Sequence, residues 1–110
     1  MAIDQNKALL AIQQQLKELD LIYRDTMEGS LNTVSGTERV AKWRVRTIAL
    51  LNESVSEKAA QEFSRLQPGM VFTNDLVEEF TDLVDCFRVP LKALEQQMSK
   101  AGQHPPGGGS

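Results

Sequence analysis

The chain has 110 residues, enough for one small domain, and its apolar content of 41% and charged content of 25% fit a globular protein. A formal net charge of −3 does not provide the broad positive surface that nucleic acids require, so nucleic acid is not expected as a partner. The single cysteine, Cys86, excludes an internal disulfide, and its apolar neighbours predict a small buried side chain. Without a long apolar run or a secretory leader, we expect a cytoplasmic protein that does not enter a membrane.

The sequence divides into a predicted helical domain, residues 1–100, and a tail, residues 101–110, that is rich in proline and glycine. The tail has no apolar surface to bury, and its last letters, GGGS, are typical of an engineered linker. We therefore expect a flexible tail or linker attached to a domain that was taken from a longer protein. The only histidine, His104, lies in this tail, so we assign it no catalytic or metal-binding role.

The first predicted helix covers residues 4–28. Its apolar residues recur at spacings of three and four along one stripe: Leu9, Ile12, Leu16, Leu19 and Tyr23. Leu10, Leu21 and Ile22 widen this apolar face, which indicates contact with more than one neighbouring helix. Gly29 and the polar residues after it are expected to end the helix.

The second predicted helix opens with a capping box, in which Ser35 caps the backbone and Glu38 reaches back to it, and ends near Asn52. Its buried side is expected to consist of four residues: Val40, Trp43, Ile48 and Leu51. Trp43 lies among basic residues and is a candidate either for the core or for an interface. Its three-residue offset from Val40 fits the buried side and favours the core.

A short third helix is predicted from a second capping box, with Ser54 and Glu57, to about Leu66. Its apolar face is expected to consist of Ala59, Ala60, Phe63 and Leu66. The letters QPG at residues 67–69 then end it, because proline and glycine both disfavour helix continuation.

The last predicted helix begins after Asn74 or Asp75, either of which can cap it. Its apolar stripe again has spacings of three and four: Leu76, Phe80, Leu83, Phe87, Leu91, Leu94 and Met98. Pro90 lies inside this pattern and cannot donate a hydrogen bond to the carbonyl of Cys86, so we expect a kink near residues 86–90. The alternative is a true break, which would give five helices instead of four.

These elements predict an all-α fold, a small bundle of about four helices. The long first and last helices should pack together, antiparallel or crossing, while the two shorter helices close one side. The sequence lacks the groups that most enzymes use: a histidine in the folded part, a glycine-rich phosphate loop, a cysteine pair or an HExxH motif. We therefore expect no enzymatic activity and no cofactor.

Acidic residues crowd the start of the last predicted helix. Asp75, Glu78, Asp82 and Asp85 share one helical face by their spacing, and Glu79 lies beside them. A two-metal bundle site would need Glu-x-x-His pairs from facing helices, so no metal is expected here. The acidic face is either a solvated surface or a charged contact surface.

Basic residues crowd the second predicted helix in the stretch ERVAKWRVRT. Arg39, Lys42 and Arg46 share one face, while Arg44 points elsewhere. Three hypotheses remain open: a solvated face, a pairing with the acidic face of the last helix within one molecule or between two, and a site for a small anion such as a nucleotide phosphate. Complementary patches on one small domain are what a head-to-tail self-assembling module requires.

The stretch RVAKWRVRTIALLNESVSEKAAQEF, residues 39–63, resembles helical segments that precede effector domains, including TIR-like domains, in bacterial defence proteins. The shared pattern consists of Trp43 among basic residues, the pair Leu50 and Leu51, a turn with Ser56 and Glu57, and the closing Phe63. The resemblance covers about a quarter of the chain and implies an accessory domain that binds partners or assembles. No catalytic residue is carried over, because the effector domain would hold them.

The leading hypothesis is a non-enzymatic helical module for protein–protein interaction or self-assembly, whose partner is a second copy or another protein. The alternative, from a different class, is a protein that binds a small anionic ligand such as a nucleotide on residues 38–47. The candidate interaction residues are Arg39, Lys42, Arg44, Arg46, Asp75, Glu78, Asp82 and Asp85.

Overall fold

The computed structural model describes residues 5–29, 31–69 and 74–102. They form four helices: α1 (Gln5–Glu28), α2 (Thr33–Ser54), α3 (Glu57–Ser64) and α4 (Leu76–Gly102). The described residues contain no strand, and the predicted all-α fold is confirmed. None of the helices in these ranges is long and apolar enough to cross a lipid bilayer. Residues 101 and 102 continue α4, and the rest of the predicted tail lies outside the described residues.

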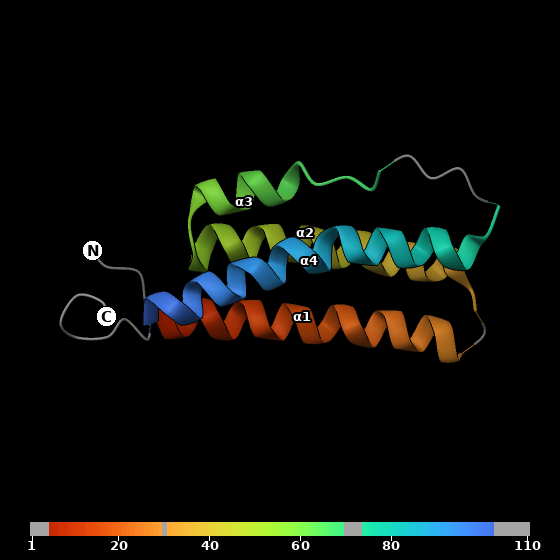
Figure 1. Cartoon of the computed structure of the whole chain (residues 1–110), viewed down its shortest axis with the longest axis horizontal. Helices are drawn as coiled ribbons and strands as arrows, with labels where there is room; N and C mark the ends of the chain where they lie inside the picture. Colours follow the sequence, from red (N-terminus) through yellow and green to blue (C-terminus); the bar gives the residue numbers. More distant parts are fainter. Residues whose placement is uncertain (1–4, 30, 70–73, 103–110) are drawn as a thin grey trace.

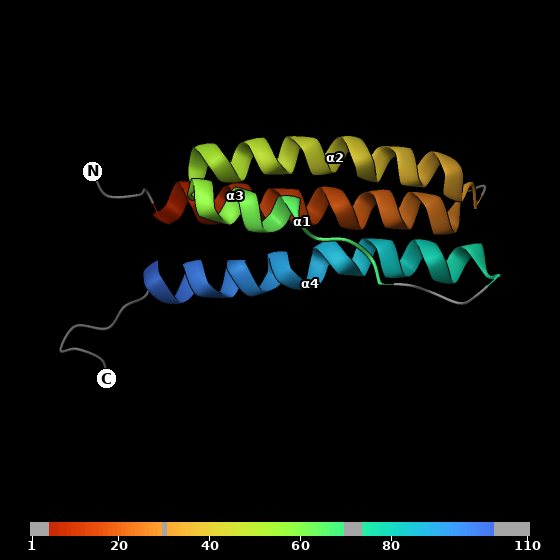
Figure 2. The ribbon, with the colours of Figure 1, turned by 90° about the horizontal axis from the view of Figure 1, so that it is seen from above.

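The three long helices lie side by side, and α1 packs against both α2 and α4 (Figure 1). The chain reverses direction at each turn, so α2 and α4 both run antiparallel to α1. The predicted pairing of the first and last helices is therefore the antiparallel one. The short helix α3 lies across the space between α2 and α4, on the opposite side of that space from α1, and touches α4 only sparsely (Figures 1 and 2).

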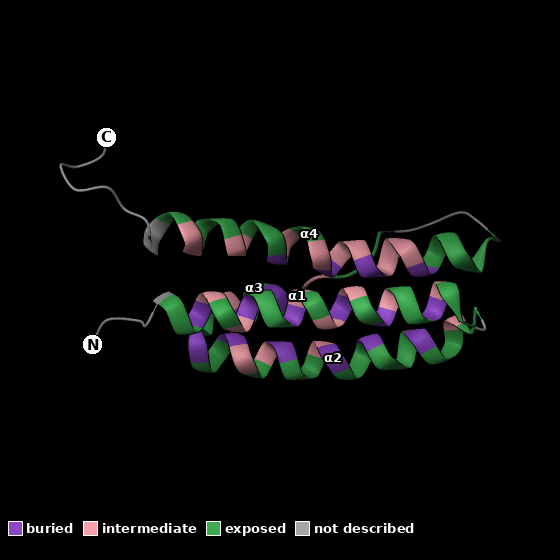
Figure 3. Cartoon of the chain, turned by 90° about the horizontal axis from the view of Figure 1, so that it is seen from below, coloured by how far each residue is buried: buried purple, intermediate pink, exposed green. Residues whose placement is uncertain are grey.

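The core lies where these helices face one another, and Figure 3 shows buried residues on the facing sides of α1, α2 and α4. Trp43 of α2 is fully buried and contacts Phe63 of α3 and Phe87 of α4 at ring distances of 5.8 and 6.0 Å. The Phe63 and Phe87 rings are 5.6 Å apart, so one aromatic cluster joins three helices. Each such pair adds about 0.5–1.5 kcal/mol beyond the area it buries. The predicted core position of Trp43 is confirmed.

Two of the three predicted helix caps differ from the capping residues in the structure. Asn32, not Ser35, caps α2: its side-chain oxygen accepts a hydrogen bond of 3.1 Å from the Ser35 N–H, which places Ser35 inside the first turn. Ser56, not Ser54, caps α3, because α2 continues to Ser54 and buries it. Both capping-box predictions are therefore wrong. Asp75 caps α4, one of the two residues predicted for it, and accepts from the Val77 and Glu78 N–H groups at 2.9 and 3.3 Å.

Pro90 lies inside α4 without ending it, so the five-helix alternative is wrong. Figure 1 shows α4 changing direction about midway along its length, as expected where a proline removes one helical hydrogen bond. The second half of α4 consequently diverges from the line of its first half.

Three residues predicted for apolar faces are exposed instead: Leu10, Leu21 and Leu76. Leu10 and Leu21 lie opposite the buried stripe of α1, which is narrower than its apolar composition indicates, and Leu21 borders a shallow hollow against α2. Leu76 belongs to the first turn of α4, beyond the reach of α3. Val84 was not predicted as core, yet it is fully buried among the α4 residues that face α1 and α2.

Candidate functional site

Two of the basic residues of α2 bind carboxylates of α1. Arg39 forms an ion pair with Asp25 at 3.2 Å, and Arg46 forms one with Glu18 at 3.6 Å. The acidic partners come from α1 because α1 is the direct neighbour of α2 on this side. The hypothesis that Arg39 and Arg46 pair with the acidic face of α4 inside one molecule is therefore wrong. These pairs are half exposed, so each is worth about 0–1 kcal/mol.

Lys42 lies on the same face of α2, as predicted from its spacing. It is exposed and lines a shallow hollow together with Leu21 and Glu18 of α1. Among the described residues no ion pair of Lys42 is found, unlike those of Arg39 and Arg46. The positive charge of Lys42 therefore lies close to the exposed Leu21 side chain.

Arg44 points away from this face, as predicted, and stabilises the end of α3. Its Nη2 group donates hydrogen bonds to the carbonyl oxygens of Ser64 at 2.6 Å and Leu66 at 3.0 Å. The guanidinium lies 5.1 Å from the centre of the Phe87 ring, a cation–π geometry. A cation at the last carbonyls of a helix also suits the helix dipole. Arg44 thus has a structural role and does not belong to the basic surface.

The acidic residues of α4 have separate surroundings. Asp75 caps the helix, and Asp85 binds Arg88, whose guanidinium lies 5.9 Å from the centre of the Tyr23 ring on α1. Glu78 is exposed and Asp82 is half buried. Within the described ranges no group of three or more histidine, cysteine, aspartate or glutamate side chains could hold a metal ion.

A long apolar groove, which we call the α2–α4 groove, lies between the first halves of α2 and α4. Two adjoining hollows of about 450 and 420 Å³ form it and share Thr37 and Leu83. Three of the large apolar side chains that line it are exposed to solvent: Val34, Val45 and Leu76, at 69%, 68% and 61%. Phe80 and Phe87 lie deeper in the same groove.

The groove exists because the fourth position of the bundle is only partly filled. Helix α3 has eight residues, whereas α2 has 22 and α4 has 27. Seen from above in Figure 2, α3 covers one end of the space between α2 and α4. Beyond it the segment of residues 65–69 passes toward α4, and Pro68 of this segment lines the groove. Apolar side chains that a longer α3 would bury are therefore left open to solvent.

Carboxylates flank the open end of this groove. Glu38 of α2 and Glu79 of α4 both line it. Among the described residues that line the groove, the one cationic side chain is Arg44, at the other end, where it already binds the carbonyl groups of Ser64 and Leu66. Sequence reasoning missed this site, although Val34 and Val45 gave a signal, because they fall off the buried stripe of α2.

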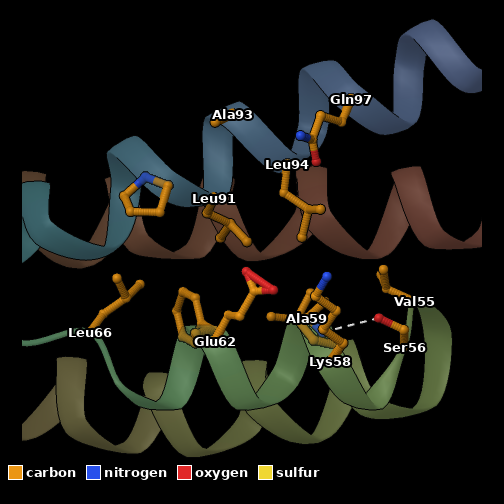
Figure 4. Close-up of a pocket in the computed structure, with 13 residues that line it drawn as sticks. Val55, Ser56, Lys58, Ala59, Glu62, Leu66, Leu91, Ala93, Leu94 and Gln97 are labelled. Atoms are coloured by element: carbon orange, nitrogen blue, oxygen red, sulfur yellow. Dashed lines mark hydrogen bonds between the residues drawn. The ribbon is translucent and has the colours of Figure 1, made fainter.

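A second groove of about 540 Å³, which we call the α3–α4 groove, separates α3 from the second half of α4. Figure 4 shows Leu91 and Leu94 pointing from α4 toward α3, and Glu62 reaching from α3 toward α4. Lys58 also lines it, so carboxylate and ammonium groups lie together at one apolar wall. This mixture gives the α3–α4 groove no preference for a partner of either charge.

Cys86 is half buried instead of fully buried as predicted. Burial raises the pKa of its thiol, an effect that the Arg44 guanidinium opposes and the Asp85 carboxylate reinforces. The thiol therefore stays protonated at neutral pH, whereas a reactive cysteine needs a lowered pKa.

Comparisons with protein-family models, with curated proteins and with solved structures gave no match to this chain. The resemblance of residues 39–63 to accessory domains of bacterial defence proteins consequently stays a prediction. Among the surfaces described above, the α2–α4 groove is the most apolar, and the charged side chains at its open end, Glu38 and Glu79, are both acidic.

Proposed function

We propose that this chain is a non-enzymatic helical interaction module that binds an amphipathic helix in the α2–α4 groove. The observation that carries the proposal is the concentration of exposed Val34, Val45 and Leu76 in one groove at the unfilled position of the bundle. Exposed apolar side chains that gather in one place are typical of interaction sites. Their burial by a partner contributes about 25 cal/mol for each Å² removed from water.

A helix is the partner shape that suits this groove. The α2 wall extends from Thr33 to Ile48, which is about 22 Å at 1.5 Å per residue and matches a helix of about 15 residues. A helix laid there would occupy the same position relative to α2 and α4 that α3 occupies at the other end. Helix-in-groove binding of this kind reads apolar residues at spacings of three and four.

The charge of the partner follows from the flanks of the groove. Glu38 and Glu79 favour a helix whose apolar stripe is bordered by lysine or arginine, and they disfavour one bordered by carboxylates. Such charges contribute mainly to the rate of association and to the choice of partner, while the apolar contacts supply most of the affinity.

The nucleotide-binding alternative receives no support from the geometry of residues 38–47. Arg39 and Arg46 bind α1 carboxylates, and Arg44 binds carbonyl groups, so a phosphate would have to displace existing partners. Within our proposal, the module acts in the cytoplasm as an accessory domain of a larger bacterial defence protein, in line with the resemblance of residues 39–63.

A designed peptide tests the proposal. It has 16 residues, leucines at helical spacing on one side and lysines on both flanks, and its binding is followed by fluorescence anisotropy. We expect saturable binding, and weaker binding for the same peptide with glutamates in place of the lysines. Val34→Lys should abolish binding by placing a like charge in the groove.

The matched control is Val89→Lys, since Val89 is exposed to a similar extent, 64%, on α4 but does not line the groove. This variant should bind the basic peptide as the unmodified chain does. Equal binding of basic and acidic peptides, or equal loss with both lysine variants, would contradict the proposed site. No binding of either peptide would reject the function.

A further inference from the structure

The outer face of α1 carries the chemistry that the α2–α4 groove fits. Leu10 and Leu21 are 65% and 53% exposed on the side of α1 opposite its buried stripe. They lie about three helical turns apart, and the exposed Lys17 and Arg24 lie on the same side of the helix. We call these four residues the α1 outer face. It is an amphipathic surface with two apolar side chains, and Lys17 and Arg24 are the charged residues nearest to them on this side. The exposed carboxylate Glu28 lies on the same side, one turn beyond Arg24.

The spacing of the two leucines matches the spacing of the exposed valines in the groove. Val34 and Val45 of α2 are also about three turns apart, so a helix running along the groove brings both leucines to both valines in one register. If the bound helix shifted along the groove by less than about one turn, both leucine–valine contacts would be lost together. The equal spacing therefore favours one register.

Charge complementarity points the same way. Lys17 and Arg24 border the leucines, and Lys42 of α2 lies next to Leu21 in the shallow hollow between the two helices. Arg24 already forms an ion pair of 2.8 Å with Asp20, but this pair is exposed and therefore weak. The opposite surface, the groove, presents Glu38 and Glu79.

We infer that the helix bound by the α2–α4 groove is the α1 outer face of a second copy of this chain, so that copies associate head to tail. The inference rests on the proposed function and names its partner. The two surfaces lie on different sides of one molecule, and each copy therefore offers one of each. Lys42 would then act between molecules, toward Glu38 and Glu79 of the second copy. These carboxylates are not the acidic face (Asp75, Glu78, Asp82 and Asp85) that the sequence offers as a partner for the basic residues.

The test measures mass in solution by light scattering behind size exclusion over a range of concentrations. The unmodified chain should rise above the mass of one chain, and more so at low salt than at high salt, because screening weakens the charge contacts. Leu21→Glu, which spoils only the α1 outer face, and Val34→Lys, which spoils only the groove, should each stay monomeric. Val89→Lys should assemble like the unmodified chain.

Mixing the two monomeric variants gives the decisive result. The Val34→Lys chain keeps an intact α1 outer face and the Leu21→Glu chain keeps an intact groove, so the mixture should regain a twofold mass. A mixture that stays at the mass of one chain would overturn the inference. So would an unmodified chain that stays monomeric at every concentration, or a Leu21→Glu chain that assembles normally.

These failures are distinguishable from a failure of the proposed function. A monomeric chain that still binds the basic peptide in the groove would overturn the second copy as partner and leave a foreign basic helix in its place. A monomeric chain that binds no peptide would overturn both.

Discussion

The indole nitrogen of Trp43 donates a hydrogen bond of 2.8 Å to the main-chain carbonyl oxygen of Gln15 on the neighbouring helix α1. The Gln15 side chain in turn donates from Nε2 to the hydroxyl of Thr47 at 2.8 Å, and this hydroxyl donates to the Trp43 carbonyl at 2.8 Å. All three residues are buried, so the bonds form in a medium of low dielectric. They fix the register of α1 against α2 more specifically than apolar contacts alone would.

Replacement of the hydroxyl in this network should be costly. Thr47→Val keeps the shape of the side chain but leaves the buried Nε2 group of Gln15 without its acceptor. An unsatisfied buried donor costs about 1–3 kcal/mol, so the free energy of unfolding should fall by that amount. Urea unfolding followed by circular dichroism measures the change.

The double variant Gln15→Leu, Thr47→Val provides the control, because it removes donor and acceptor together. It should be more stable than Thr47→Val alone, although it carries one more substitution. A double variant with the full summed loss of both single variants would show that the two side chains do not interact in solution.

Gly36 is the place where α2 approaches its neighbours too closely for a side chain. A Cβ atom there would lie 2.6 Å from the Thr26 hydroxyl oxygen on α1 and 2.9 Å from the Phe80 ring on α4. Alanine is favoured over glycine in a helix by about 1 kcal/mol, but overpacking costs about 1–3 kcal/mol. We expect Gly36→Ala to lower the melting temperature. Gly69→Ala is the control, because a Cβ atom there meets no atom within 4 Å, and it should leave the melting temperature nearly unchanged.

The helices were predictable because their signals are local. Ile12 and Leu19 belong to the apolar stripe predicted for α1, and Phe87 belongs to the one predicted for α4. All three are buried. The caps were less predictable, since Asn32 and Ser35 are both good capping residues and only the path of the preceding turn decides between them. Leu76 continues a helical stripe but is exposed, because a stripe identifies a face without showing whether a neighbour covers it.

The candidate site depended on relations that spacing cannot supply. Periodicity placed Arg39 and Arg46 on one face of α2, yet the choice of α1 carboxylates as partners follows from which helix packs beside that face. The groove arises from where the short α3 sits on α2, which its predicted length alone does not reveal. Val45 indicates a binding surface only together with the open hollow beside it, which the sequence does not show.

Arg44 holds the end of α3 against the bundle, and its replacement should act locally. Lysine keeps the charge but lacks the planar group that donates to the carbonyls of Ser64 and Leu66 while it stacks on Phe87. Arg44→Lys should therefore speed amide hydrogen exchange in α3 several-fold and leave exchange in α1 nearly unchanged. Arg24→Lys is the control, since Arg24 forms only an exposed pair within α1. Unchanged exchange in α3 would show that Arg44 does not hold it.

Cys86 gives the domain a predictable dependence on alkaline pH. Burial raises the pKa of its thiol in the folded chain above the ordinary value of about 8.5, so above that pH the unfolded chain loses the proton first. The protonated thiol contributes fully to the free energy of unfolding below the thiol pKa of the unfolded chain. This contribution is lost as pH rises through the thiol pKa of the folded chain, because the unfolded chain then binds fewer protons than the folded chain. Cys86→Ser should remove this part of the decline in the free energy of unfolding, measured by urea titrations from neutral to alkaline pH.

Alkylation of Cys86 by iodoacetamide at neutral pH should also be slower for the folded chain than for the same chain in denaturant. Equal alkylation rates, or identical pH profiles for the two chains, would contradict the raised pKa.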